Sequence, residues 1–145
     1  MKGEVIAVCT SEGKGTPKRN VGSGELKEEW GLVGDAHAGN WHRQVSLLAM
    51  ESIEKMQAKG LKVRPGSFAE NVTIRGLELH TLPVGTRLRL GKALAEVTQI
   101  GKECHDRCAI YYQAGDCVMP REGIFVRILR GGAVSVGDTV EVLET

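Results

Sequence analysis

The sequence predicts a mainly β protein of the α+β class, with one or two short helices. The chain has 145 residues, about the length of one domain, so residues 1–145 are expected to form a single domain. Hydrophobic residues make up 41% and charged residues 26%, which is enough apolar material for a packed core. Nineteen glycines and four prolines favour short strands and turns over long helices.

The first half of the chain is expected to contain two strands, a helix and two irregular segments. The apolar run 5–9 lacks polar alternation and predicts a buried strand. Residues 11–24 contain four glycines without periodicity, so we expect a loop; a phosphate-binding loop is the alternative, although the P-loop spacing is incomplete. Residues 30–41 alternate glycine with polar residues and are expected to be irregular, with no buried face. Strand-like residues 45–48 precede a helix over 51–59, which the next glycine would end.

The second half consists of short β segments separated by glycine turns. Leu88 and Leu90 alternate with two arginines, so one face of that strand is expected to be exposed to solvent. Turn signals at intervals of about 8 to 12 residues indicate a closed or sandwiched β architecture. The expected strands cover residues 71–74, 86–90, 93–100, 124–129 and 139–143.

Charge and hydropathy exclude two classes of partner. The formal net charge is only +1 and is spread evenly, whereas nucleic-acid binding normally requires a basic face, so we expect no nucleic-acid partner. A small anionic ligand remains open. The longest uncharged apolar stretch, residues 45–50, is far below the roughly 20 residues that cross a bilayer. With no signal-peptide pattern either, we expect a cytoplasmic protein without a membrane partner.

The densest group of reactive side chains lies between residues 101 and 117. In a reducing compartment, cysteines are more often thiols, metal ligands or nucleophiles than disulfides. If residues 103–112 form a helix, Cys104 lies in its first turn near Lys102 and Arg107, which favours a reactive thiolate. Cys108 would lie one turn further along the same face. Cys9, within the apolar run, is expected to fill core space.

A structural zinc site is the alternative for this group. Cys104, His105, Cys108 and Cys117 are four soft ligands within fourteen residues. Adjacent cysteine and histidine residues rarely bind one ion together, and no second ligand pair is present elsewhere. Zinc is therefore a secondary interpretation, and Cys108 and Cys117 are secondary candidates as metal ligands.

Two further polar clusters are candidate binding segments. In the glycine-rich stretch 34–46, His37 and Arg43 are expected to contact an anion or substrate. Asp35 and Gln44 are equally consistent with hydrogen bonds that brace the loop. After the Pro65–Gly66 turn, Glu70 and Asn71 are candidates either for ligand binding or for capping the turn, while His80 is expected to be structural.

Several ordered motifs together resemble a stand-alone MOSC domain, named after the C-terminal domain of molybdenum cofactor sulfurases. The resemblance covers nearly the whole chain. It rests on the motifs GDAHAG (34–39), HRQVSLL (42–48), PGSFAEN (65–71), GKECH (101–105), GDCVMPREGIF (115–125), and the closing GG (131–132) and VGD (136–138).

The resemblance implies a closed barrel of the pyruvate-kinase type and a cysteine that handles sulfur or molybdenum. Cys104 matches that cysteine, which in the amidoxime-reducing enzymes is a direct metal ligand. No pyridoxal phosphate is expected, because the sulfurases carry it in a separate domain. Ala69 replaces a usual glycine, so a different turn geometry is expected there. The implied cofactor contacts are Asp35, His37, His42, Arg43, Glu70, Asn71, Lys102 and Arg107.

The leading functional hypothesis is molybdenum cofactor binding, with Cys104 as metal ligand or sulfur carrier during cofactor maturation. Possible partners are molybdopterin or another small anionic ligand, a cysteine desulfurase, or a molybdoenzyme that accepts the cofactor. One alternative is a small molybdenum-dependent reductase of N-oxygenated compounds. The other is a zinc-stabilised binding module without catalysis.

Overall fold

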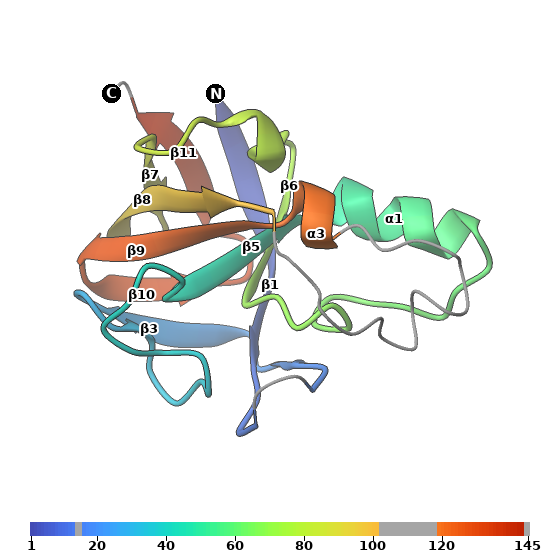
Figure 1. Cartoon of the computed structure of the whole chain (residues 1–145), viewed down its shortest axis with the longest axis horizontal. Coiled ribbons are helices and arrows are strands. Elements are labelled where there is room, and N and C mark those ends of the chain that lie inside the picture. Colours follow the sequence, from blue (N-terminus) through green and yellow to red (C-terminus); the bar gives the residue numbers. More distant parts are fainter. Residues whose placement is uncertain (14–15, 102–118, 144–145) are drawn as a thin grey trace.

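Strands form most of the regular secondary structure over residues 1–13, 16–101 and 119–143, the residues that this computed structural model describes (Figure 1). There are also two helices, α1 (Met50–Ala58) and the single turn α3 (Met119–Glu122), and a 3-10 turn, η1 (Leu79–Thr81). The strands are β1 (Lys2–Thr10), β2 (Arg19–Asn20), β3 (Ser23–Lys27), β4 (Gly31–Leu32), β5 (Val45–Ala49), β6 (Val72–Arg75), β7 (Arg87–Leu90), β8 (Ala93–Ile100), β9 (Ile124–Arg130), β10 (Gly132–Ser135) and β11 (Thr139–Leu143).

Seven of the described strands close into a barrel, which confirms the predicted mainly β fold and its closed architecture. Their order is β11-β7-β8-β9-β5-β6-β1, and β1 pairs with β11 to complete the ring. Neighbours are antiparallel except for the β5–β6 pair, which is parallel and connected through α1. A small sheet of β10, β3 and β4 packs beside the barrel, where β10 and β3 are labelled in Figure 1. Strand β2 pairs with the end of β1. In the part of the chain described, no helix is long and apolar enough to span a membrane.

The barrel wall formed by β5 and β9 is covered on both sides. Successive side chains of a strand point to opposite faces. Val45 and Leu47 on β5, with Val126 on β9, belong to the apolar barrel interior. Leu48 and Phe125 belong instead to a second apolar cluster outside the barrel, against α1. All five residues of β5 are therefore buried, and its outer face is available to build a site beneath a protein cover.

Helix α1 provides part of that cover. Ile53 and Met56, three residues apart on one face, are fully buried in the outer cluster, as their spacing predicted. The helix ends at its C-cap Lys59, and Gly60 follows with φ of +90°, which confirms the expected glycine stop. Glu122 of α3 ties α3 to the helix, because it accepts hydrogen bonds from Ser52 and Lys55.

The two segments expected to be irregular are more ordered than their sequence indicates. The range 11–24 contains β2 and the start of β3, and the range 30–41 contains β4, whose Leu32 is 1% exposed in the barrel core. The expectation that 30–41 has no buried face is therefore wrong. The reason is tertiary: β3 pairs with β10, more than a hundred residues away, and β4 then pairs with β3.

Candidate functional site

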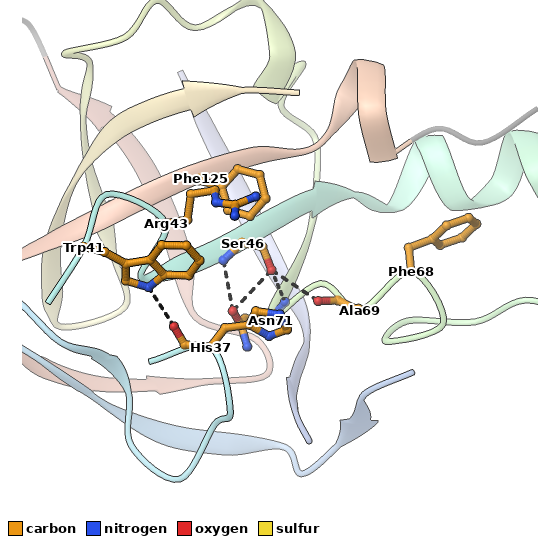
Figure 2. Close-up of a pocket in the computed structure, with 8 residues that line it drawn as sticks. All are labelled: His37, Trp41, Arg43, Ser46, Phe68, Ala69, Asn71 and Phe125. Carbon is orange, nitrogen blue, oxygen red and sulfur yellow. Dashed lines mark hydrogen bonds between the residues drawn. The ribbon is translucent and has the colours of Figure 1, made fainter. Parts of the chain in front are cut away.

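A small pocket lies on the outer face of the β5–β9 wall, between the loop that precedes β5 and the turn that precedes β6 (Figure 2). The cavity volume is about 70 Å³. Pockets for drug-sized ligands usually measure roughly 300–1,000 Å³, so this one accepts a group such as a single oxyanion rather than a whole pterin. Its walls are formed by His37, Trp41, Arg43, Ser46, Phe68, Ala69, Asn71 and Phe125.

Arg43 is held between two aromatic rings on one side of this pocket. Its guanidinium carbon lies 4.6 Å from the ring centre of Trp41 and 5.5 Å from that of Phe125. Both contacts are within the range of cation–π attraction. Trp41 is itself fixed, since its indole Nε1 donates a hydrogen bond to the carbonyl of His37 at 2.9 Å. Within the described structure, the Nε of Arg43 is buried and has no hydrogen-bond acceptor. A buried guanidinium donor without an acceptor is suited to bind an anion.

Ser46 and Asn71 join the barrel wall to the turn that precedes β6. The amide N and the hydroxyl of Ser46 donate to Asn71 Oδ1 at 3.0 and 3.2 Å, and the Asn71 amide N donates back to Ser46 Oγ at 3.0 Å. Asn71 Nδ2 donates to the carbonyl of Cys9 on β1 at 3.1 Å. These bonds occupy the polar groups of Ser46 and Asn71, so both residues position the floor of the pocket.

A buried ion pair lies behind His37. The side chains of Lys18 and Asp35 are both fully buried, and Lys18 Nζ lies 2.8 Å from Asp35 Oδ1. Burial opposes ionisation of Asp35, but hydrogen bonds from Lys18 and from the amide of Ser11 outweigh it, and the pKa of Asp35 is lowered. The carboxylate also accepts the backbone N–H of His37 at 3.1 Å. Asp35 thus anchors the loop that carries His37.

Glu70 has a different role, because it stabilises its own turn. Its carboxylate accepts hydrogen bonds from the amides of Gly66 and Phe68 and from the hydroxyl of Thr73, at 2.9, 3.3 and 2.8 Å. Burial raises the pKa of Glu70, and these hydrogen bonds oppose the rise. Gly66, with φ of +94°, is required here, since a Cβ would lie 2.1 Å from the Lys18 carbonyl oxygen. Ala69 has φ of +62°, so the turn keeps glycine-like geometry despite the alanine.

Cys9 lies in the core beneath this turn, as expected from its apolar run. It is fully buried, and burial, followed by the nearby carboxylate of Glu70, raises the pKa of its thiol to about 12. Since only the thiolate is nucleophilic, Cys9 is unreactive at neutral pH.

The structure separates the predicted site residues into four groups. His37, Arg43 and Asn71 line the pocket. Asp35 and Glu70 lie behind it as supports, as does Gln44, which donates to Glu29 and accepts from the amide of Ile128. His42 is exposed, does not line the pocket, and pairs with Gln99 across 2.9 Å. The residues that lie outside the described part of the chain are Lys102, Cys104, Arg107, Cys108 and Cys117.

Sequence reasoning missed the roles of three residues. The sequence predicts a loop at Lys18, and a single lysine between glycines carries no periodic signal of burial. Trp41 and Phe125 stand out in the sequence only as parts of longer motifs. Their combined role, to hold Arg43 from two sides, requires two segments more than eighty residues apart to meet.

The pocket therefore offers hydrogen-bond donors and aromatic surface to a small anion. The described residues include no group of three or more histidine, cysteine, aspartate or glutamate side chains able to hold a metal ion. A metal-binding thiolate would have to come from the 102–118 segment. The donor set present fits the anionic portion of a phosphorylated cofactor.

Comparison with known proteins identifies similar folds and one matching domain family. No curated protein sequence matches the chain. Among solved structures, the chain is similar to the YuaD protein of Bacillus subtilis, with a TM-score of 0.81, 19% identity, and coverage of 98% of this chain and 96% of that one. It is also similar to YiiM of Escherichia coli, with a TM-score of 0.69, 23% identity, and coverage of 100% and 71%.

YiiM of Geobacillus stearothermophilus gives a TM-score of 0.71 at 17% identity, with coverage of 98% and 75%. At these identities the structural likeness shows the fold alone. The sequence model of the MOSC domain matches residues 34–141, which is most of the chain. The chain therefore belongs to the MOSC domain family, and this membership implies a binding role related to the molybdenum cofactor.

Proposed function

We propose that this protein binds the molybdenum cofactor with its anionic portion in the Arg43 pocket, and that Cys104 is the metal ligand or sulfur carrier. The observation that supports this most is the buried Nε of Arg43, held between Trp41 and Phe125 without an acceptor. Holding a guanidinium in one orientation lowers the entropic cost of binding an anion there. A soft thiolate is a ligand suited to molybdenum or sulfane sulfur.

The length of chain between the pocket and Cys104 supports the same assignment. Phe125, on the pocket wall, pairs with Gln99 of β8, and the amide of Gly101 donates to the carbonyl of Gly123 at 2.7 Å. Cys104 follows Gly101 by three residues in the sequence. This short separation supports the proposal that Cys104 acts on a ligand bound in the pocket.

Each described residue then has a specific task. Arg43 and His37 bind the anionic portion, and the rings of Trp41 and Phe125 keep Arg43 in place. Asp35, Glu70 and Asn71 fix the loops that carry these groups. Lys102 and Arg107 are proposed as further cationic contacts. When bound, the cofactor supplies a molybdenum centre capable of redox chemistry or of holding a terminal sulfur.

For the sulfur-carrier form of the proposal, a cysteine desulfurase with a persulfide is the donor. The Cys104 thiolate attacks the outer sulfur, a new S–S bond forms on Cys104, and the donor cysteine leaves as a thiolate. A molybdoenzyme would then be the acceptor. Mass spectrometry after incubation with a persulfide donor distinguishes this form, because Cys104 gains one sulfur atom.

The test of binding is anaerobic incubation with molybdenum cofactor, followed by metal and pterin analysis. We expect the wild type to retain both, Cys104→Ser to retain little molybdenum, and Arg43→Gln to bind at least tenfold more weakly. Cys9→Ala and Arg75→Gln are matched controls, since the first removes an unreactive buried thiol and the second an exposed arginine away from the pocket. Equal retention by the wild type and Cys104→Ser would remove Cys104 from the site.

Two other outcomes would replace the proposal. Zinc at unit stoichiometry, with unfolding on chelation, would support a structural zinc module instead. Steady turnover of an N-hydroxylated substrate by loaded protein with an electron donor would show a reductase rather than a carrier.

A further inference from the structure

The buried Lys18 behind the pocket makes three side-chain contacts, one of them with His37. Lys18 Nζ lies 2.8 Å from Asp35 Oδ1, 3.1 Å from Ser11 Oγ and 3.0 Å from His37 Nδ1. Its side chain is fully buried. The backbone around it is also fixed, since the amide of Lys18 donates to the carbonyl of Gly66 at 2.7 Å.

The chemistry of the ammonium group fixes the direction of these hydrogen bonds. A charged lysine has three N–H donors and no acceptor. Asp35 Oδ1 accepts one donor, and Ser11 Oγ accepts another while its own hydroxyl donates to the Gly13 carbonyl. The third donor is directed to His37 Nδ1, which must therefore present a lone pair. In a neutral imidazole the ring proton is then on Nε2.

Asp35 does not stabilise the other neutral tautomer of His37, in which the proton is on Nδ1. A proton on His37 Nδ1 would need an acceptor, and Asp35 Oδ2, the carboxylate oxygen that the described residues place beside it, is 3.9 Å away, beyond hydrogen-bond distance. That oxygen already accepts the backbone N–H of His37. An Nδ1–H would also point at the Lys18 ammonium, placing two donors 3.0 Å apart.

We infer that Lys18 is a positioning residue that holds His37, which lines the pocket, as the neutral Nε2–H tautomer. In this form Nδ1 already accepts from Lys18 and Nε2 carries the ring proton, so the ring favours oxyanion acceptors over groups that bring their own donors. For the identity of the ligand this inference rests on the proposed function. For the tautomer it rests only on the buried contacts.

The decisive measurement is made on the unliganded wild-type protein. Nitrogen-15 NMR of the histidine rings distinguishes the Nδ1–H, Nε2–H and doubly protonated forms, and the substitutions His42→Gln, His80→Gln and His105→Gln assign the signals. At slightly alkaline pH we expect His37 to be at least 90% Nε2–H, while the exposed His80 provides an internal reference. A predominant Nδ1–H form in His37 would overturn the inference, because an ammonium cannot accept that proton.

Variants then test whether Lys18 is the cause. Lys18→Met alone leaves Asp35 buried without its partner, so the informative variant is Lys18→Met combined with Asp35→Asn, which removes both charges. We expect the tautomer preference of His37 in this double variant to fall to that of His80. Lys18→Arg, which keeps a donor-only cation, is expected to retain the Nε2–H form. An unchanged His37 signal in the double variant would overturn the role of Lys18.

Binding of inorganic phosphate separates this inference from the proposed function. The apparent affinity scales with the fraction of the competent tautomer, so phosphate binding to the double variant is expected to weaken in proportion to its measured loss of the Nε2–H form. If His37 is in the Nε2–H form but neither phosphate nor cofactor binds, the role of Lys18 stands and the proposed function is rejected. If the cofactor binds while His37 is in the Nδ1–H form, the proposed function stands and the role of Lys18 is rejected.

Discussion

Two buried carboxylates beneath the same pocket differ in what compensates their burial. Asp35, in the loop before β5, is paired with the buried ammonium of Lys18, and its pKa is lowered. Glu70, in the turn before β6, accepts hydrogen bonds from neutral groups, among them two amides and a hydroxyl, and its pKa is raised. Hydrogen bonds that include one from a charged lysine outweigh the desolvation of Asp35, whereas neutral donors do not outweigh that of Glu70.

This difference assigns distinct tasks to the two supports. The Asp35 network carries a cation whose remaining donor reaches His37, so it controls the chemistry of the pocket wall. The Glu70 network fixes the turn that places Ala69 and Asn71 at the pocket, through two backbone amides and the Thr73 hydroxyl. Substitutions in the first network are therefore expected to change both stability and the state of His37, and substitutions in the second to change stability and turn geometry.

The largest expected effect comes from breaking the ion pair on one side. Lys18→Met leaves the Asp35 carboxylate buried and unpaired, and we expect the free energy of unfolding to fall by about 3–5 kcal/mol. The double variant Lys18→Met with Asp35→Asn should recover most of this loss, because no uncompensated charge remains. Urea denaturation measures both. Equal destabilisation of the single and double variants would show that the packing of Lys18 matters rather than its charge.

The pH dependence of stability is expected to have opposite signs at the two carboxylates. Because the pKa of Asp35 is lowered, its stabilising contribution is present above the unfolded value of about 3.9 and is lost as pH falls through the folded pKa. Because the pKa of Glu70 is raised, its contribution is full below about 4.3 and is lost as pH rises through the folded pKa. Each unit of difference between the folded and unfolded pKa corresponds to about 1.4 kcal/mol in the free energy of unfolding.

Asp35→Asn and Glu70→Gln isolate these two dependences. Relative to Asp35→Asn, the wild type should lose its advantage on acidification, and relative to Glu70→Gln it should lose stability on going from pH 4 toward neutrality. Denaturation curves between pH 3 and pH 8 provide the measurement. The same sign for both variants would mean that the two carboxylates are compensated alike, and the contrast between them would be lost.

A smaller change in the free energy of unfolding is expected on substitution of Ala69, the residue that precedes Glu70. Ala69 has φ of +62°, a conformation that costs a non-glycine residue about 1–2 kcal/mol. Ala69→Gly removes this strain but gives the unfolded chain more freedom, so we expect a net gain of about 0.5–1 kcal/mol in unfolding free energy. Gly66→Ala is the matched control, with a clear loss expected because its Cβ would collide with the Lys18 carbonyl. Destabilisation by Ala69→Gly would refute strain in the turn.

The smallest effect is expected at a surface ion pair. Arg75 and Glu54 lie 3.1 Å apart, and their side chains are 46% and 45% exposed. Arg75→Ala should lower the free energy of unfolding by less than about 0.5 kcal/mol, and less still in high salt, because solvent screens the pair. A thermal melt in low and high salt tests this. A loss as large as that of Lys18→Met would mean that burial is not what separates the buried pair from the exposed one.

The sequence by itself determined the strands and the helix in which apolar residues recur at regular spacing along the chain. Residues 139–143 form β11 with the predicted bounds, and the strand at 45–48 and the helix at 51–59 are found within one residue of their expected limits. The reason is local, because the alternation of apolar and polar residues in a strand, and their spacing in a helix, indicate which face of the element is buried. The family resemblance added barrel closure, and the composition of the 34–46 and 66–71 segments correctly marked both loops that line the pocket.

The tertiary structure alone decided which side chains of those loops face the pocket. His37 lines it and His42 does not, although both are histidines in one short segment. Lys18 is buried because Asp35, His37 and the Gly66 turn enclose it, and β10 exists because β3 lies beside it. Each of these facts depends on contacts between distant parts of the chain, which leave no periodic trace in the sequence around the residue concerned.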